Sequence, residues 1–164
     1  MRRAGEAMFS FFKPRPTDPR RDFLEAFLFY WFSENGFKCA RVERNGIDFL
    51  VKNVETGELL GIAVRGASAS EQRVFIPREE LEDARTACAG FGATPSFALA
   101  SAEADETWLF VVKGERLAGM SSANSDGIDW SFNQAAIDGY LEDPTIMSVK
   151  VSWKARRWRQ TWTT

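Results

Sequence analysis

Residues 46–65 constrain the fold more than any other stretch, because they predict two strands joined by a tight turn. The first run carries Asp48 among apolar residues, and Thr56-Gly57 marks the turn. The second run is apolar and ends at Arg65. The hairpin therefore sets the centre of the expected fold, and the flanking segments are expected to complete one α/β domain around it.

The flanking segments predict the order helix, three strands, helix, two strands, and then a C-terminal helix and strand. The expected helices are 18–34, 77–89 and 134–141, the expected strands are 37–43, 47–52, 58–65, 94–100, 107–113 and 146–153, and residues 72–76 are an expected edge strand. Residues 118–130 are rich in Ser, Asn, Asp and Gly and are expected to be a polar loop.

The first expected helix is apolar on nearly every side, which is typical of a buried helix or of a partner surface. Phe23, Phe27, Tyr30 and Trp31 share one stripe, and burial is the preferred interpretation. Glu25 is the only charge between Asp22 and Glu34. It is expected to face either solvent or a polar cleft.

The length of 164 residues and the 45% hydrophobic content fit one domain with a sizeable core. A Pro-Arg-Pro run separates residues 1–17 as a flexible basic arm. The expected domain is 18–152, and 153–164 form a basic tail rich in Trp.

The absence of His excludes Ser-His and Cys-His catalysis, so any chemistry must depend on carboxylates, Lys, Arg or a metal. Cys39 and Cys88 are far apart and lack metal-binding spacing, which predicts reduced thiols and a cytoplasmic protein. No apolar run approaches the roughly 20 residues of a membrane-spanning helix.

The net charge of −2 conceals an asymmetry, because basic residues gather at both ends and acidic residues in the middle. In the tail, cations that can neutralise phosphates alternate with indoles that can stack on bases. The candidate nucleic-acid-binding residues are Lys150, Lys154, Arg156, Arg157, Arg159, Trp153 and Trp158. DNA or RNA could bind through these basic ends, and the alternative is a solvated end whose tryptophans pack on the domain.

The predicted order of elements, with Asp48 on the second strand and Arg65 ending the third, resembles the PD-(D/E)XK nuclease superfamily. This resemblance implies a restriction-endonuclease-like fold, shared with Holliday-junction resolvases, over roughly residues 20–113. In that superfamily a strand Asp and an acid or Gln on the next strand hold Mg²⁺, and a Lys two residues later helps to activate water. Carried over, Asp48 is the first metal ligand and Arg65 takes the Lys position. Glu25 takes the place of an additional helix acid.

Two departures weaken the motif. Ala63 stands where the second metal ligand belongs, and Arg65 stays protonated where Lys would assist catalysis. Asp48, with or without Glu25, then offers at most a weak Mg²⁺ site, and no cofactor is required. Glu58 and Glu71 are poor replacements, because Glu58 has the wrong strand parity and Glu71 lies beyond the strand end.

The sequence thus predicts a catalytically inactive nuclease-like domain that binds nucleic acid or a protein partner, which could be a second copy of the chain. One alternative is a Mg²⁺-dependent endonuclease with a rearranged site. Another is a pure interaction module that uses the aromatic first helix, or Phe9, Phe11 and Phe12, against a protein or a membrane surface. Asp48 and Arg65 could also form a purely structural ion pair.

Overall fold

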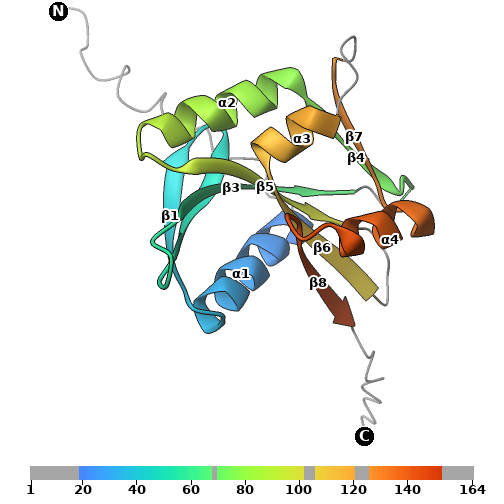
Figure 1. Ribbon diagram of the computed structural model, residues 1–164, viewed down its shortest axis with the longest axis horizontal. Helices are drawn as coiled ribbons and strands as arrows, with labels where there is room; N and C mark the ends of the chain where they lie inside the picture. The colour runs from blue at the N-terminus through green and yellow to red at the C-terminus, as the bar shows by residue number, and fades with distance from the viewer. Residues whose placement is uncertain (1–18, 68–69, 102–105, 121–125, 153–164) are drawn as a thin grey trace, which may run out of the picture.

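A six-stranded mixed sheet in the order β1-β2-β3-β5-β6-β8 divides the molecule into two layers (Figure 1). The computed structural model describes residues 19–67, 70–101, 106–120 and 126–152. The strands of this sheet are β1 (Phe37–Arg44), β2 (Ile47–Asn53), β3 (Leu59–Gly66), β5 (Thr94–Ala100), β6 (Glu106–Lys113) and β8 (Met147–Ser152). The predicted three-stranded meander and the mixed sheet are confirmed.

Only β3 and β5 run parallel, in a register from Leu60 opposite Thr94 to Gly66 opposite Ala100. All other neighbours in the six-stranded sheet are antiparallel. Gly46 forms the turn between β1 and β2 with φ +97°, a left-handed conformation that glycine adopts without strain. A Cβ at Gly46 would also collide with the backbone of Asp83, so this turn lies directly on the helix opposite.

Helix α1 (Pro19–Glu34) covers one face of the sheet and buries Leu24, Leu28 and Phe32. The expectation that the aromatic stripe would be buried is wrong in part, because Phe23 is 47% and Tyr30 64% exposed. A helix that is apolar on every side gives no pattern from which the buried face can be read.

The other face carries α2 (Arg78–Ala89), α3 (Gly114–Met120) and α4 (Gln134–Glu142), together with a two-stranded sheet. Strands β4 (Arg73–Pro77) and β7 (Gly127–Ser131) pair antiparallel to form that small sheet. Figure 1 shows this ribbon beside α3. Trp130, Phe110 and Tyr140 pack against one another in the core between these elements.

The expected polar loop at 118–130 is partly wrong, because α3 extends to Met120 and β7 begins at Gly127. Strand β7 pairs with β4 from a distant part of the sequence, a contact that local composition does not reveal. The expected arm 1–17 and tail 153–164 lie outside the described residues. Within the described part of the chain, no helix is long and apolar enough to cross a membrane.

Candidate functional site

Asp48 lies just beyond the end of the β2–β3 ladder, whose paired residues run from Phe49 opposite Ile62 to Lys52 opposite Leu59. Its side chain is only 2% exposed. The Oδ2 atom accepts a hydrogen bond of 2.8 Å from the backbone N–H of Val64. The carboxylate therefore satisfies a buried β3 donor that the ladder with β2 does not reach.

Arg21 on α1 joins Asp48 to Glu25. Its Nη2 donates to Asp48 Oδ1 at 2.6 Å, and its Nε donates to Glu25 Oε1 at 2.9 Å, one helical turn along α1. Burial lowers the pKa of Arg21, but the charge of Asp48 and the hydrogen bonds to both acids outweigh it and raise the pKa above its ordinary value. This guanidinium is therefore a permanent positive charge.

Arg65 on β3 contacts Asp48 from the other side. Its Nη1 lies 3.7 Å from Asp48 Oδ2 and also donates to the carbonyl oxygen of Val64 at 2.7 Å. Its Nε donates to Glu80 Oε2 at 2.6 Å, which links β3 to the first turns of α2. Arg65 thus bonds most closely to a helix acid and contacts Asp48 at longer range.

Three acids and three arginines alternate across α1, β1, β2, β3 and α2, and we call them the ion-pair chain. Its outer cation, Arg41, is 60% exposed and places Nη1 3.6 Å from Glu25 Oε2. In order, the members are Arg41, Glu25, Arg21, Asp48, Arg65 and Glu80. Their formal charges cancel, which is the usual condition for partly buried charged groups.

The structure brings together the three sequence-predicted site residues Asp48, Arg65 and Glu25 in this chain. Sequence reasoning missed Arg21 and Glu80. Arg21 carried a local signal, because it precedes Glu25 by one helical turn. Glu80 appeared only as a first-turn acid of a helix, and its proximity to Arg65 depends on how α2 docks on β3.

Ala63 and the two replacement acids lie outside the ion-pair chain. Ala63 is fully buried opposite Phe97 of β5, within the core on the α2 side. Glu58 forms an ion pair with Lys113. Glu71 lines a separate pocket.

The residues around Asp48 do not fit a Mg²⁺ ion, which requires several oxygen ligands in near-octahedral geometry. Both carboxylate oxygens of Asp48 already face donors, namely Arg21 on Oδ1 and Val64 N–H with Arg65 on Oδ2. Across the described residues, no group of three or more His, Cys, Asp and Glu side chains could hold a metal.

The described part of the proposed nucleic-acid site is Lys150, which lies on β8. Its Nζ is 2.7 Å from Glu106 Oε2 and 5.2 Å from the centre of the Trp108 ring. The partners thus fix Lys150 to the outer strand of the sheet. The other candidates, Trp153, Lys154, Arg156, Arg157, Trp158 and Arg159, lie outside the described residues.

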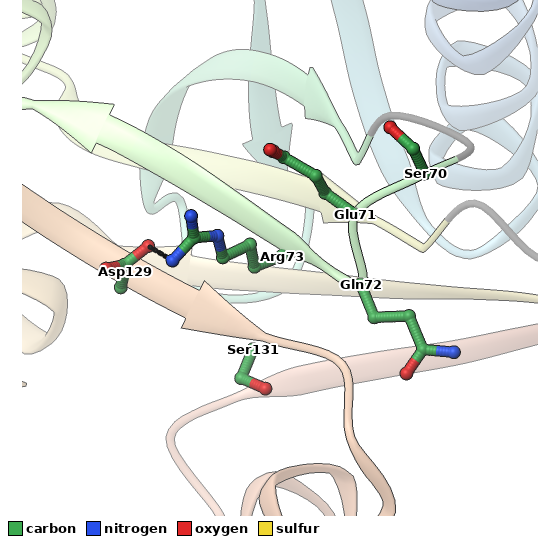
Figure 2. A pocket seen from close by; sticks show the side chains of 6 residues that line it. All are labelled: Ser70, Glu71, Gln72, Arg73, Asp129 and Ser131. Atoms are coloured by element: carbon green, nitrogen blue, oxygen red, sulfur yellow. Dashed lines mark ion pairs between the residues drawn. The ribbon is translucent and has the colours of Figure 1, made fainter.

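Two cavities lie away from the ion-pair chain. One of about 510 Å³ opens at the β4–β7 ribbon, where Arg73 and Asp129 form an ion pair of 3.9 Å (Figure 2). Figure 2 shows Glu71 and Gln72 directed to different sides of the same rim. The other, of about 470 Å³, lies among α2, β5 and α3 and includes Arg78, Arg85 and Phe97. None of the residues that line these two cavities belongs to the ion-pair chain.

No protein-family model and no curated protein sequence matches the chain. Solved structures do match. A Holliday junction resolvase, Hjc from the archaeal hyperthermophile Archaeoglobus fulgidus, is similar with a TM-score of 0.53 and 19% identity, over 71% of this chain and 86% of that one. A restriction endonuclease in complex with substrate DNA is similar with a TM-score of 0.36 and 15% identity, over 82% and 70%. The match to the resolvase shows that this chain has the restriction-endonuclease-like fold expected from its sequence.

Proposed function

From a restriction-endonuclease-like fold, we propose that the chain is a catalytically inactive nuclease-like domain that binds nucleic acid. The engagement of Asp48 carries the first half of this proposal. Its two oxygens face Arg21, Arg65 and the Val64 N–H, so the carboxylate neutralises guanidinium groups of its own chain. The fold places an acid at the expected strand, and the neighbouring residues give that acid a structural task.

The charged groups of the ion-pair chain can bind phosphate but cannot readily activate water. Metal-dependent phosphodiester hydrolysis needs a cation that polarises the phosphate and generates a nucleophile. Arg65 and Arg21 supply positive charge, yet a guanidinium stays protonated and cannot act as a base. The buried methyl of Ala63 supplies no metal ligand. Substrate binding without hydrolysis is therefore the chemistry that these residues favour.

The second half of the proposal rests on the similar resolvase and on the basic ends of the sequence. The similar protein is named for its action on a Holliday junction, a branched DNA. In this chain, Lys154, Arg156, Arg157 and Arg159 follow β8 directly and alternate with tryptophans. Cations at such positions bind the phosphate backbone, and indoles stack on unpaired bases.

The first test is a cleavage assay of the full chain on duplex, single-stranded and four-way-junction DNA and on RNA, with Mg²⁺ or Mn²⁺. We expect every substrate to stay intact. Strand cleavage that requires a divalent cation and disappears in Asp48→Ala would overturn the inactive assignment. Asp138→Ala is the matched control, because Asp138 is an exposed acid on α4 outside the ion-pair chain.

The second test is nucleic-acid binding at several salt concentrations, with the full chain and with a chain that ends at residue 152. We expect affinity to fall as salt rises, with a log–log slope of about 0.9 for each phosphate contact, and to drop at least tenfold without the tail. Equal binding by the shortened chain would refute a role for the tail. Absence of nucleic-acid binding by the full chain would leave a protein partner, for which the exposed Phe23 and Tyr30 of α1 are the available apolar surface.

An active endonuclease with a rearranged site is a second candidate, and one observation favours it. Glu80 reaches Arg65 from α2, so three carboxylates surround the two inner guanidinium groups. Substrate binding could draw Arg65 or Arg21 onto a phosphate and release those acids. This alternative predicts divalent-dependent cleavage that is lost in both Asp48→Ala and Glu80→Ala.

A further inference from the structure

The Arg21 guanidinium lies between two carboxylates that come from different elements. Asp48 Oδ1 on β2 is 2.6 Å from Nη2, and Glu25 Oε1 on α1 is 2.9 Å from Nε. The side chains of Asp48 and Glu25 are 2% and 13% exposed, so water reaches neither freely. Two carboxylates thus converge on one positive group in a nearly buried place.

Such convergence is unfavourable without a cation, because like charges held out of water repel and each loses hydration. The other arginines face different oxygen atoms. Arg65 approaches Asp48 Oδ2 at 3.7 Å, and Arg41 approaches Glu25 Oε2 at 3.6 Å. Arg21 is therefore the described cation that faces Asp48 Oδ1 and Glu25 Oε1 together.

We propose that Arg21 stands in the place of a divalent cation, and that Asp48 and Glu25 bind such a cation once the guanidinium is removed. This inference deepens the proposed function, because it names the group that keeps metal away from Asp48. Mg²⁺ and Mn²⁺ are commonly bound through one or two carboxylates, with water completing the coordination. With two carboxylates, the uncovered site should have a dissociation constant of about 1 mM, far from the affinity of a dedicated metal centre.

The experiment measures the thermal midpoint of the full-length Arg21→Met protein as MgCl₂ or MnCl₂ is added at constant ionic strength. Methionine keeps the length and apolar stem of arginine and removes the charge. We expect Arg21→Met to unfold below the wild type without metal and to gain about 3–6 °C in about 10 mM Mn²⁺. The wild type should gain no more than a control variant.

The control is Arg85→Met, which removes an exposed arginine paired with Glu82 on α2, outside the ion-pair chain. A second variant, Asp48→Asn with Arg21→Met, removes one proposed ligand and should lose the response to Mn²⁺. An Arg21→Met protein that responds no more than Arg85→Met overturns the proposal. So does one that stays unfolded both with and without about 10 mM Mn²⁺.

The outcomes separate this inference from the proposed function. Cleavage by the wild type would refute the inactive assignment whatever the response of Arg21→Met. An Arg21→Met protein that ignores Mn²⁺, beside an inactive wild type, would refute only the stand-in role of Arg21.

Discussion

At the scale of single residues, Asp48 is the point where three elements meet. From β2 its carboxylate accepts a bond from β3 through Val64 N–H, and it pairs with Arg21 of α1. Arg65 of β3 is the more distant partner, at 3.7 Å. A buried carboxylate with such partners is costly to leave alone, so the stability of the fold depends on which cation compensates it.

A double-mutant cycle measures that dependence. We expect the coupling energy of Asp48→Asn with Arg21→Met to be about 1–3 kcal/mol, because the pair is short and Asp48 is buried. The coupling of Asp48→Asn with Arg65→Met should be smaller, since Arg65 bonds mainly to Glu80. Urea unfolding of the four single and double variants gives both values. An Arg65 coupling equal to or above that of Arg21 would contradict the assignment of Arg21 as the main partner.

Ala63 illustrates the same constraint from the apolar side. Its side chain is fully buried in the core against α2, so Ala63→Glu would place a carboxylate among apolar groups. We expect a loss of about 2–4 kcal/mol in the free energy of unfolding by urea titration. Ala135→Glu, exposed in the first turn of α4, is the control and should change stability by less than about 0.5 kcal/mol. Similar losses in the two variants would show that the Ala63 position is open to water.

At the scale of elements, the close approach of α2 to the sheet positions Glu80 beside Arg65. A Cβ on Gly61 of β3 would collide with the Cys88 sulfur of α2, and burial raises the pKa of that thiol. The helix can approach so closely because Gly61 lacks a side chain. The geometry of the ion-pair chain therefore depends on a packing contact at the far end of α2.

Two glycine substitutions test this contact. Gly61→Ala should lower the free energy of unfolding by about 1–3 kcal/mol, because the added methyl must displace α2. Gly139→Ala on α4 meets no atom within 4 Å and should raise stability by about 0.5–1 kcal/mol through helix propensity. Both are measured by urea unfolding. A neutral Gly61→Ala would show that α2 can move away without cost.

Asp143 connects α4 to the β8 side of the fold and predicts a dependence of stability on pH. Hydrogen bonds from the Thr145 hydroxyl and backbone, followed by one from Arg116, lower the pKa of Asp143 from 3.8 to about 2. A lowered pKa in the folded state stabilises the protein above pH 3.8, and this contribution is lost as the pH falls through about 2.

Thermal unfolding of wild type and Asp143→Asn checks this dependence. The wild type should be the more stable at pH 5–7, and the gap should narrow between pH 3.8 and about 2. Asp138→Asn, an exposed α4 acid bonded to Gln134, is the control and should show no such convergence. A constant gap between wild type and Asp143→Asn down to about pH 2 would contradict the role given to the Thr145 and Arg116 bonds.

At the scale of the whole molecule, local pattern predicted most elements and the restriction-endonuclease-like fold. Strand alternation and turn residues are local properties, so the meander and strand β5 follow from the sequence. Strand β7 was missed because its pairing with β4 spans about fifty residues of chain. The buried face of α1 was misassigned because every side of that helix is apolar.

The candidate site was predictable to the same extent. Asp48 and Arg65 lie on neighbouring strands of a predictable hairpin, so their proximity follows from the hairpin itself. Arg21 lies 27 residues from Asp48 and Glu80 lies 15 from Arg65, and both contacts depend on how a helix docks. The residues that change the meaning of the site are therefore those that tertiary packing supplies.

The most direct test of the central claim is whether the wild-type chain binds Mn²⁺ at Asp48. Electron paramagnetic resonance of the full-length protein, titrated with MnCl₂, measures the free ion. Because guanidinium groups and a backbone donor already face both Asp48 oxygens, the free-ion signal should match that of Asp48→Asn at every concentration up to about 1 mM. A stoichiometric loss of free Mn²⁺ in the wild type, absent from Asp48→Asn, would contradict the claim and restore a metal site to this fold.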